Sequence, residues 1–69
     1  MGTVEENWEA MKQTAMEKLR EVMSRRKLPP NWHDLSWMID DFCKQPAPTS
    51  TSELAHRSLQ LNRIFDTIP

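Results

Sequence analysis

The residues with the most potential chemistry lie between positions 33 and 43, where two adjacent aspartates are flanked by a histidine and a cysteine. Paired carboxylates can act together as a general acid and base. On a helix, however, neighbouring side chains point about 100° apart, so Asp40 and Asp41 do not share a proton there. We therefore interpret the pair as part of a solvated acidic face.

The sequence also gives little reason to expect metal binding or catalysis by the thiol of Cys43. A metal site needs several convergent ligands, and the candidates in this region do not converge tightly on one helical face: His33, Asp34, Asp40 and Asp41. Cys43 lies at the edge of an apolar arc, and a catalytic thiol has to be activated beside a histidine. We expect Cys43 to be an inert core thiol, and we predict no enzyme, no cofactor and no metal.

Three amphipathic helices are predicted to position these residues, so the fold class is all-α, a small three-helix bundle. The first helix is long, from about residue 3 to 27, the second spans about 31–44, and the third about 51–67. Apolar residues recur at spacings of three and four along the first segment, which is typical of one buried helical face: Val4, Trp8, Met11, Ala15, Leu19 and Val22. We assign residues 1–69 to a single domain.

The boundaries of these helices carry local signals. Thr3 and Ser50 are each followed three residues later by glutamate, which fits a capping box at the start of the first and third helices. Pro29 and Pro30 end the first helix because proline lacks an N–H and clashes with the preceding turn. Asn31 then fits the N-cap of the second helix. The stretch 45–51, rich in proline, serine and threonine, is expected to be a loop.

Composition narrows the class of protein. The 69 residues include 9 basic and 10 acidic side chains, with a net charge of −1, so there is no global field to hold nucleic acid or an anionic membrane. No apolar run approaches the ~20 residues of a membrane-spanning helix, and no signal peptide is recognisable. A single cysteine favours a reducing, intracellular location, cytoplasmic or nuclear. Residues 1–2 are compatible with an expression remnant, and the chain is equally compatible with a domain of a longer protein.

One residue conflicts with the amphipathic pattern of the second helix. Trp37 falls among charged residues rather than on the apolar arc, and Leu59 is similarly misplaced on the third helix. The first helix should also overhang its shorter partners, which would leave Val4 and Trp8 uncovered. Because tryptophan is enriched at binding hot spots, we predict that these four residues form a surface for another protein chain. An alternative is that the first helix wraps around the second and covers Trp37.

The sequence therefore favours a non-enzymatic protein–protein interaction or oligomerisation module, an adapter or regulatory domain acting by helix-face docking. Its partner would be another protein chain or a second copy, with no membrane involved. The alternative function is a small nucleic-acid-binding regulator, in which the basic end of the first helix and the third helix contact phosphates and bases. The residues for that role would be Arg25, Arg26, Lys27, Arg57 and Arg63.

Overall fold

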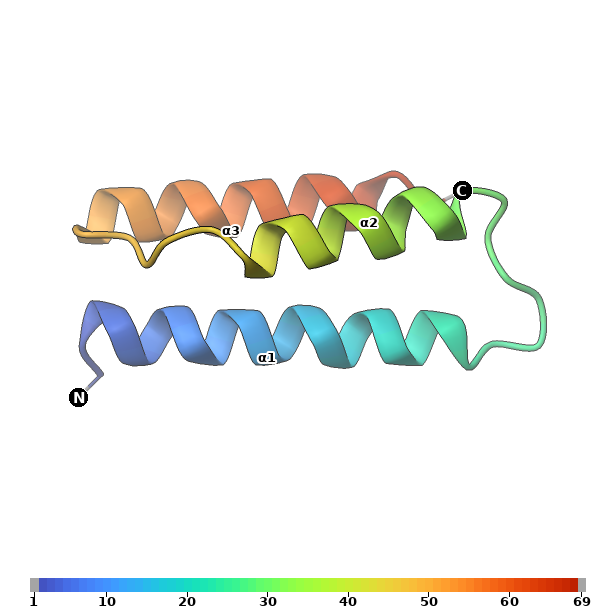
Figure 1. The fold of residues 1–69 in the computed structure, drawn as a ribbon, viewed down its shortest axis with the longest axis horizontal. Helices are drawn as coiled ribbons and strands as arrows, with labels where there is room; N and C mark the ends of the chain where they lie inside the picture. The colour runs from blue at the N-terminus through green and yellow to red at the C-terminus, as the bar shows by residue number, and fades with distance from the viewer. Residues whose placement is uncertain (1, 69) are drawn as a thin grey trace.

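A computed structural model describes residues 2–68, which form three helices and no strands. The helices are α1 (Val4–Met23), α2 (Trp32–Cys43) and α3 (Thr51–Asp66). In Figure 1, α1 and α3 run in the same direction, and α2 runs in the opposite direction. Each helix packs against both others, and the bundle measures 38 × 17 × 17 Å along its principal axes. The prediction of an all-α three-helix bundle is confirmed.

Two of the three predicted helix starts have the expected caps. The side-chain oxygen of Thr3 accepts a hydrogen bond from the Glu6 N–H at 3.1 Å, and Ser50 accepts one from the Glu53 N–H at 3.1 Å. The carboxylate of Glu53 also accepts a hydrogen bond of 2.8 Å from the Thr49 N–H. These bonds satisfy donors that have no partner inside the helices.

At the third predicted start, Asn31 occupies the N-cap position of α2 as predicted, but the expected side-chain hydrogen bond is absent. Asn31 makes no side-chain hydrogen bond to the first turn of α2. Its amide Nδ2 instead donates to the carbonyl oxygen and the Oγ1 of Thr67, at 3.1 and 3.0 Å. Asn31 therefore ties the start of α2 to the residue that follows α3, a contact between positions far apart in the chain.

The first helix ends earlier than predicted, at Met23 rather than near residue 27. The Ser24 hydroxyl donates to the Glu21 carbonyl oxygen at 2.8 Å, so it competes for an acceptor of the last turn. Prolines at 29 and 30 also disfavour helical backbone in the residue before them. Residues 25–27 therefore lie in the α1–α2 connection rather than in the last helical turn, and Pro29 is buried there while Leu28 stays exposed.

The core lies along the line where the three helices meet. Trp8 packs edge-on against Phe42, with the ring centroids 5.2 Å apart and the ring planes at 60°. Such edge-to-face pairs contribute about 0.5–1.5 kcal/mol beyond the burial of their area. The buried hydrophobic residues come from all three helices: Trp8, Ala15 and Val22 in α1, Leu35, Ile39 and Phe42 in α2, and Leu61 in α3.

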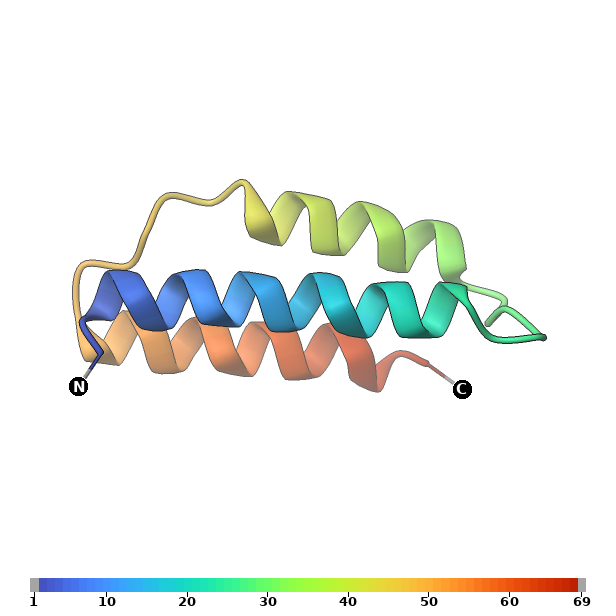
Figure 2. The same cartoon turned by 90° about the horizontal axis from the view of Figure 1, so that it is seen from below.

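The expected overhang of α1 does not occur. Helix α2 has only 12 residues, but the extended connection after it runs on beside the N-terminal half of α1, as Figure 2 shows. Pro48 in this connection is buried, and Ala47 lines the same surface hollow as Trp8. Helix α3 can therefore begin beside the start of α1 (Figure 1). The proline-rich connection thus covers the part of α1 for which the sequence predicted an external partner.

Candidate functional site

Trp37 stands out from the rest of the bundle because its side chain is 69% exposed. The four residues one helical turn away from it on either side are polar, and three of them are aspartates: His33, Asp34, Asp40 and Asp41. Periodicity places Trp37 about 160° around α2 from the buried Leu35, so the side chain points away from the core. The prediction that Trp37 is exposed is confirmed, and α1 does not wrap over it.

A shallow groove lies between α1 and α2 on one side of Trp37. Its apolar residues include Met16 from α1, which is 53% exposed, and Cys43 from α2, which is half-buried. We call it the α1–α2 groove, and its lining residues are Met16, Leu19, His33, Ser36, Trp37, Ile39, Asp40 and Cys43. Met16 follows Ala15 of the buried stripe of α1, and the periodicity of a single helix does not connect it with Trp37. The pairing becomes visible only when the two helices are placed together.

A second groove lies between α2 and α3 on the other side of Trp37. It combines apolar side chains with the carboxylate of Asp41, the amide of Gln60 and the guanidinium of Arg63. We call it the α2–α3 groove, and its lining residues are Trp37, Met38, Asp41, Phe42, Gln45, Gln60, Arg63 and Ile64. Trp37 therefore forms a ridge between two hollows.

The four predicted partner-binding residues are not brought together. Trp8 is only 2% exposed, so its assignment to an exposed surface is wrong; Phe42 and the proline-rich connection cover it. Val4 is half-buried beside it on α1. Leu59 is 55% exposed, as expected from its position on α3. It is not among the residues that line either groove beside Trp37.

The residues of the nucleic-acid alternative are dispersed as well. Arg25 pairs with Glu21 at 3.2 Å, and it lies with Arg26 and Lys27 in the α1–α2 connection. Arg57 is near the opposite end of the bundle, where its guanidinium lies over the Trp8 ring. Arg63 lines the α2–α3 groove. This distribution does not favour a single basic surface, and the alternative remains a prediction.

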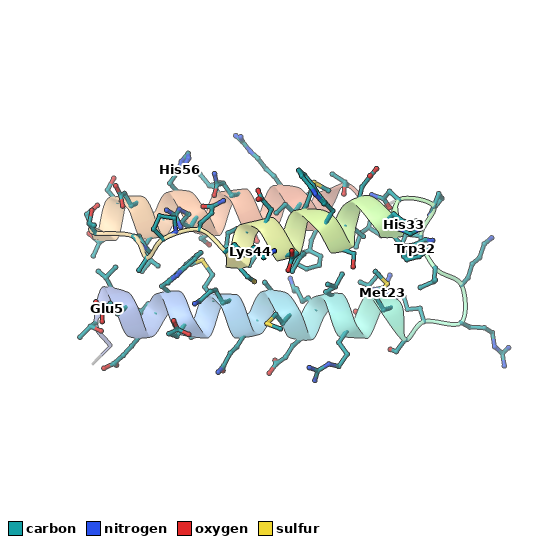
Figure 3. All side chains as sticks on the ribbon, viewed as in Figure 1. Glu5, Met23, Trp32, His33, Lys44 and His56 are labelled. Carbon is teal, nitrogen blue, oxygen red and sulfur yellow. The ribbon has the colours of Figure 1, made fainter. Side chains whose placement is uncertain are left out.

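Cys43 has the environment of an unreactive thiol. Burial raises its pKa above the ordinary value, and nearby Asp40 adds to the effect, while Lys12 acts in the opposite direction. A raised pKa lowers the fraction of thiolate, which is the nucleophilic form. Within residues 2–68, no group of three or more histidine, cysteine, aspartate or glutamate side chains is placed to hold a metal ion. Figure 3 shows His33 and His56 toward opposite ends of the bundle, so they cannot share a ligand.

Comparison of the chain with protein-family models, curated proteins and solved structures gives no significant match. Among the described residues, none of the helices has the length and apolar character needed to span a membrane. Function is therefore inferred from the side chains of this bundle and from the two grooves beside Trp37.

Proposed function

We propose that this chain is a protein-interaction module that docks another protein chain on the outer face of α2, with Trp37 as the central anchor. The observation that carries the proposal is the contrast between two tryptophans in one small bundle. Trp8 is enclosed by the core, whereas Trp37 stands exposed between two grooves. Exposed aromatic side chains beside apolar hollows are typical of docking surfaces.

Burial of the exposed Trp37 surface would give a partner part of its binding energy. A tryptophan side chain buries about 150–250 Å² when fully covered. Trp37 still exposes 69% of its surface, so at about 25 cal/mol per Å² covering that part would contribute on the order of 3–4 kcal/mol. Met16, on the opposite wall of the α1–α2 groove, adds a flexible apolar side chain that adapts to the shape of a partner. The partner we envisage spans α2 and contacts both residues.

A selection experiment tests the proposal and does not require the partner to be identified. A library of randomised peptides is displayed and selected on the wild-type chain, with counter-selection on Trp37→Ala. Individual peptides are then measured against Leu59→Ala, a matched control that removes an exposed apolar side chain that lines neither groove. We expect peptides that bind the wild type and Leu59→Ala equally and bind Trp37→Ala at least about tenfold more weakly, the factor that corresponds to about 1.4 kcal/mol.

Thermal unfolding of the same variants shows whether Trp37 is a binding or a folding residue. Because no core contact is lost, Trp37→Ala should change the free energy of unfolding by no more than about 0.5 kcal/mol. Trp8→Ala should cost about 3–5 kcal/mol, which is comparable to the whole stability of so small a core. A melting temperature several degrees lower for Trp37→Ala, or a selection that yields no Trp37-dependent peptide, would contradict the proposal.

A further inference from the structure

The chemistry around Trp37 indicates which kind of partner fits. Helix α2 contains three aspartates and neither lysine nor arginine. Asp40 is neutralised by Lys44 at 2.9 Å. Asp34 and Asp41 take part in none of the ion pairs formed among residues 2–68. Two carboxylates therefore flank Trp37 without a cation of their own in this part of the chain.

Gln60, one of the residues that line the α2–α3 groove, carries a further acceptor. The Oε1 of Gln60 is buried and has no hydrogen-bond partner in the described part of the chain. An N–H donor that enters the groove would supply the missing partner once the Gln60 amide turns toward it. Gln60 also loses no existing bond at Oε1 when its amide turns toward an incoming group. The Asp41 carboxylate and the Trp37 ring line the same groove.

The Asp41 carboxylate, the Trp37 ring and the Gln60 amide oxygen all favour contact with a cationic N–H donor. A carboxylate binds a cation, a tryptophan face attracts an ammonium or guanidinium, and an amide oxygen accepts from either. We infer, as an extension of the proposed function, that the partner places a lysine or arginine side chain in the α2–α3 groove. That side chain contacts the Asp41 carboxylate, the Trp37 ring and the Gln60 amide oxygen. The partner's neighbouring apolar residue covers Trp37 from the side of the α1–α2 groove.

A second copy of the chain fits this surface less well than a basic segment of another protein. In a two-fold symmetric contact, the same patch meets itself. The aspartates around one Trp37 would then face those around the other, and like charges in close contact oppose association. Arg63 lines the α2–α3 groove together with Asp41 and takes part in none of the ion pairs among residues 2–68, so it competes with the incoming cation for the Asp41 carboxylate.

The test uses the Trp37-dependent peptides obtained by selection on the wild-type chain. We expect lysine or arginine to be enriched in them beside an apolar residue. Asp41→Asn should weaken their binding about tenfold or more, as expected for the loss of a hydrogen-bonded charge. Arg63→Gln should leave binding unchanged or strengthen it, because it removes a competing cation. Glu17→Gln, which removes one carboxylate from exposed α1 surface, is the matched control and should have no effect.

The possible failures are distinguishable. Trp37-dependent peptides without basic residues, or with affinities that Asp41→Asn leaves unchanged, overturn the inference and leave the docking function standing. Sedimentation equilibrium of the wild type over a range of concentrations provides a third result. Self-association abolished by Trp37→Ala would identify a second copy as the occupant, which also overturns the inference. Absence of any Trp37-dependent peptide together with a monomer at all concentrations overturns both proposals.

Discussion

The guanidinium carbon of Arg57 lies 5.0 Å from the centre of the Trp8 ring, and the Nη1 of the same group donates a 3.0 Å hydrogen bond to the carbonyl oxygen of Pro46. One side chain of α3 therefore contacts both the core of α1 and the connection after α2. The Nζ of Lys12 also lies near the indole, 5.6 Å from the ring centre. Arg57 holds the proline-rich connection over the end of the core that would otherwise be open.

Arg57→Ala should therefore destabilise the fold although the residue is only half-buried. Loss of the cation–π contact and the hydrogen bond should cost about 1–2 kcal/mol, which corresponds to a melting temperature lower by about 4–8 °C per kcal/mol in a domain of this size. Thermal unfolding followed by circular dichroism measures the change. Arg57→Lys keeps the charge but not the planar fork, so its melting temperature should be intermediate. Equal melting temperatures for all three proteins would show that the contact has no structural role.

Asn31→Asp separates two roles that asparagine can have at the start of a helix. As an N-cap, aspartate is about as good as asparagine, so the substitution would be harmless if Asn31 capped α2. In the structure, Nδ2 donates to Thr67, and aspartate brings a carboxylate toward the Thr67 carbonyl oxygen instead. We expect Asn31→Asp to cost about 1–2 kcal/mol in denaturant unfolding. Stability equal to that of the wild type would restore the capping role and remove the link to Thr67.

Glu53 should make the stability of the fold depend on pH in the acidic range. Hydrogen bonds from Thr49, above all from its backbone N–H, hold the pKa of Glu53 below the ordinary value, and nearby Arg57 contributes in the same direction against the effect of burial. Because the folded-state pKa is the lower one, the stabilisation is fully present above the unfolded value of about 4.3. It is lost as the pH falls through the folded-state pKa.

The difference in stability between the wild type and Glu53→Gln should therefore be constant between about pH 6 and 7 and should shrink below about pH 4. Denaturant unfolding at a series of pH values measures it. Glu17→Gln, which removes a carboxylate that accepts no side-chain hydrogen bond from the described residues, is the matched control for the change in charge. A difference that does not vary with pH would mean that the Thr49 hydrogen bonds do not favour the ionised form.

Cys43 should react slowly with iodoacetamide in the folded protein, because burial raises the pKa of its thiol and limits access to it. In denaturant the rate should rise to that of an ordinary exposed thiol. Mass spectrometry of samples quenched over time gives both rates. Because Cys43 lines the α1–α2 groove, a peptide bound across Trp37 should slow the reaction further. A folded-state rate equal to the denatured rate would show that the thiol is freely exposed.

The features that the sequence predicted correctly depend on neighbouring residues. The caps at Thr3 and Ser50 involve a partner three positions away, and the exposure of Trp37 follows from helical periodicity alone. Two predictions failed because they depended on distant residues. Asn31 is engaged by Thr67, 36 positions later. Trp8 is covered by the proline-rich connection between α2 and α3, and the path of that connection cannot be predicted from neighbouring residues.

The candidate site shows the same division. Periodicity identifies Trp37 as an outward-facing residue, but it does not show that Met16 lies across a groove from it or that Gln60 lacks a partner among the described residues. Both features depend on how the helices are rotated about their axes relative to one another, and the pattern of a single helix does not specify this rotation. Leu59 is a further example. Its exposure could be predicted from the sequence, but its position outside the two grooves beside Trp37 could not.

The odd number of helices has a consequence for re-engineering the chain. With α1 and α3 running in the same direction, the start of α1 and the end of α3 lie at opposite ends of the bundle (Figure 1). A linker that joined them in a circular permutant would have to run back along the length of α3, about 24 Å at 1.5 Å per residue, and would need at least about eight extended residues. Permutants with shorter linkers should fail to fold, whereas a head-to-tail tandem needs no linker that runs back along the bundle.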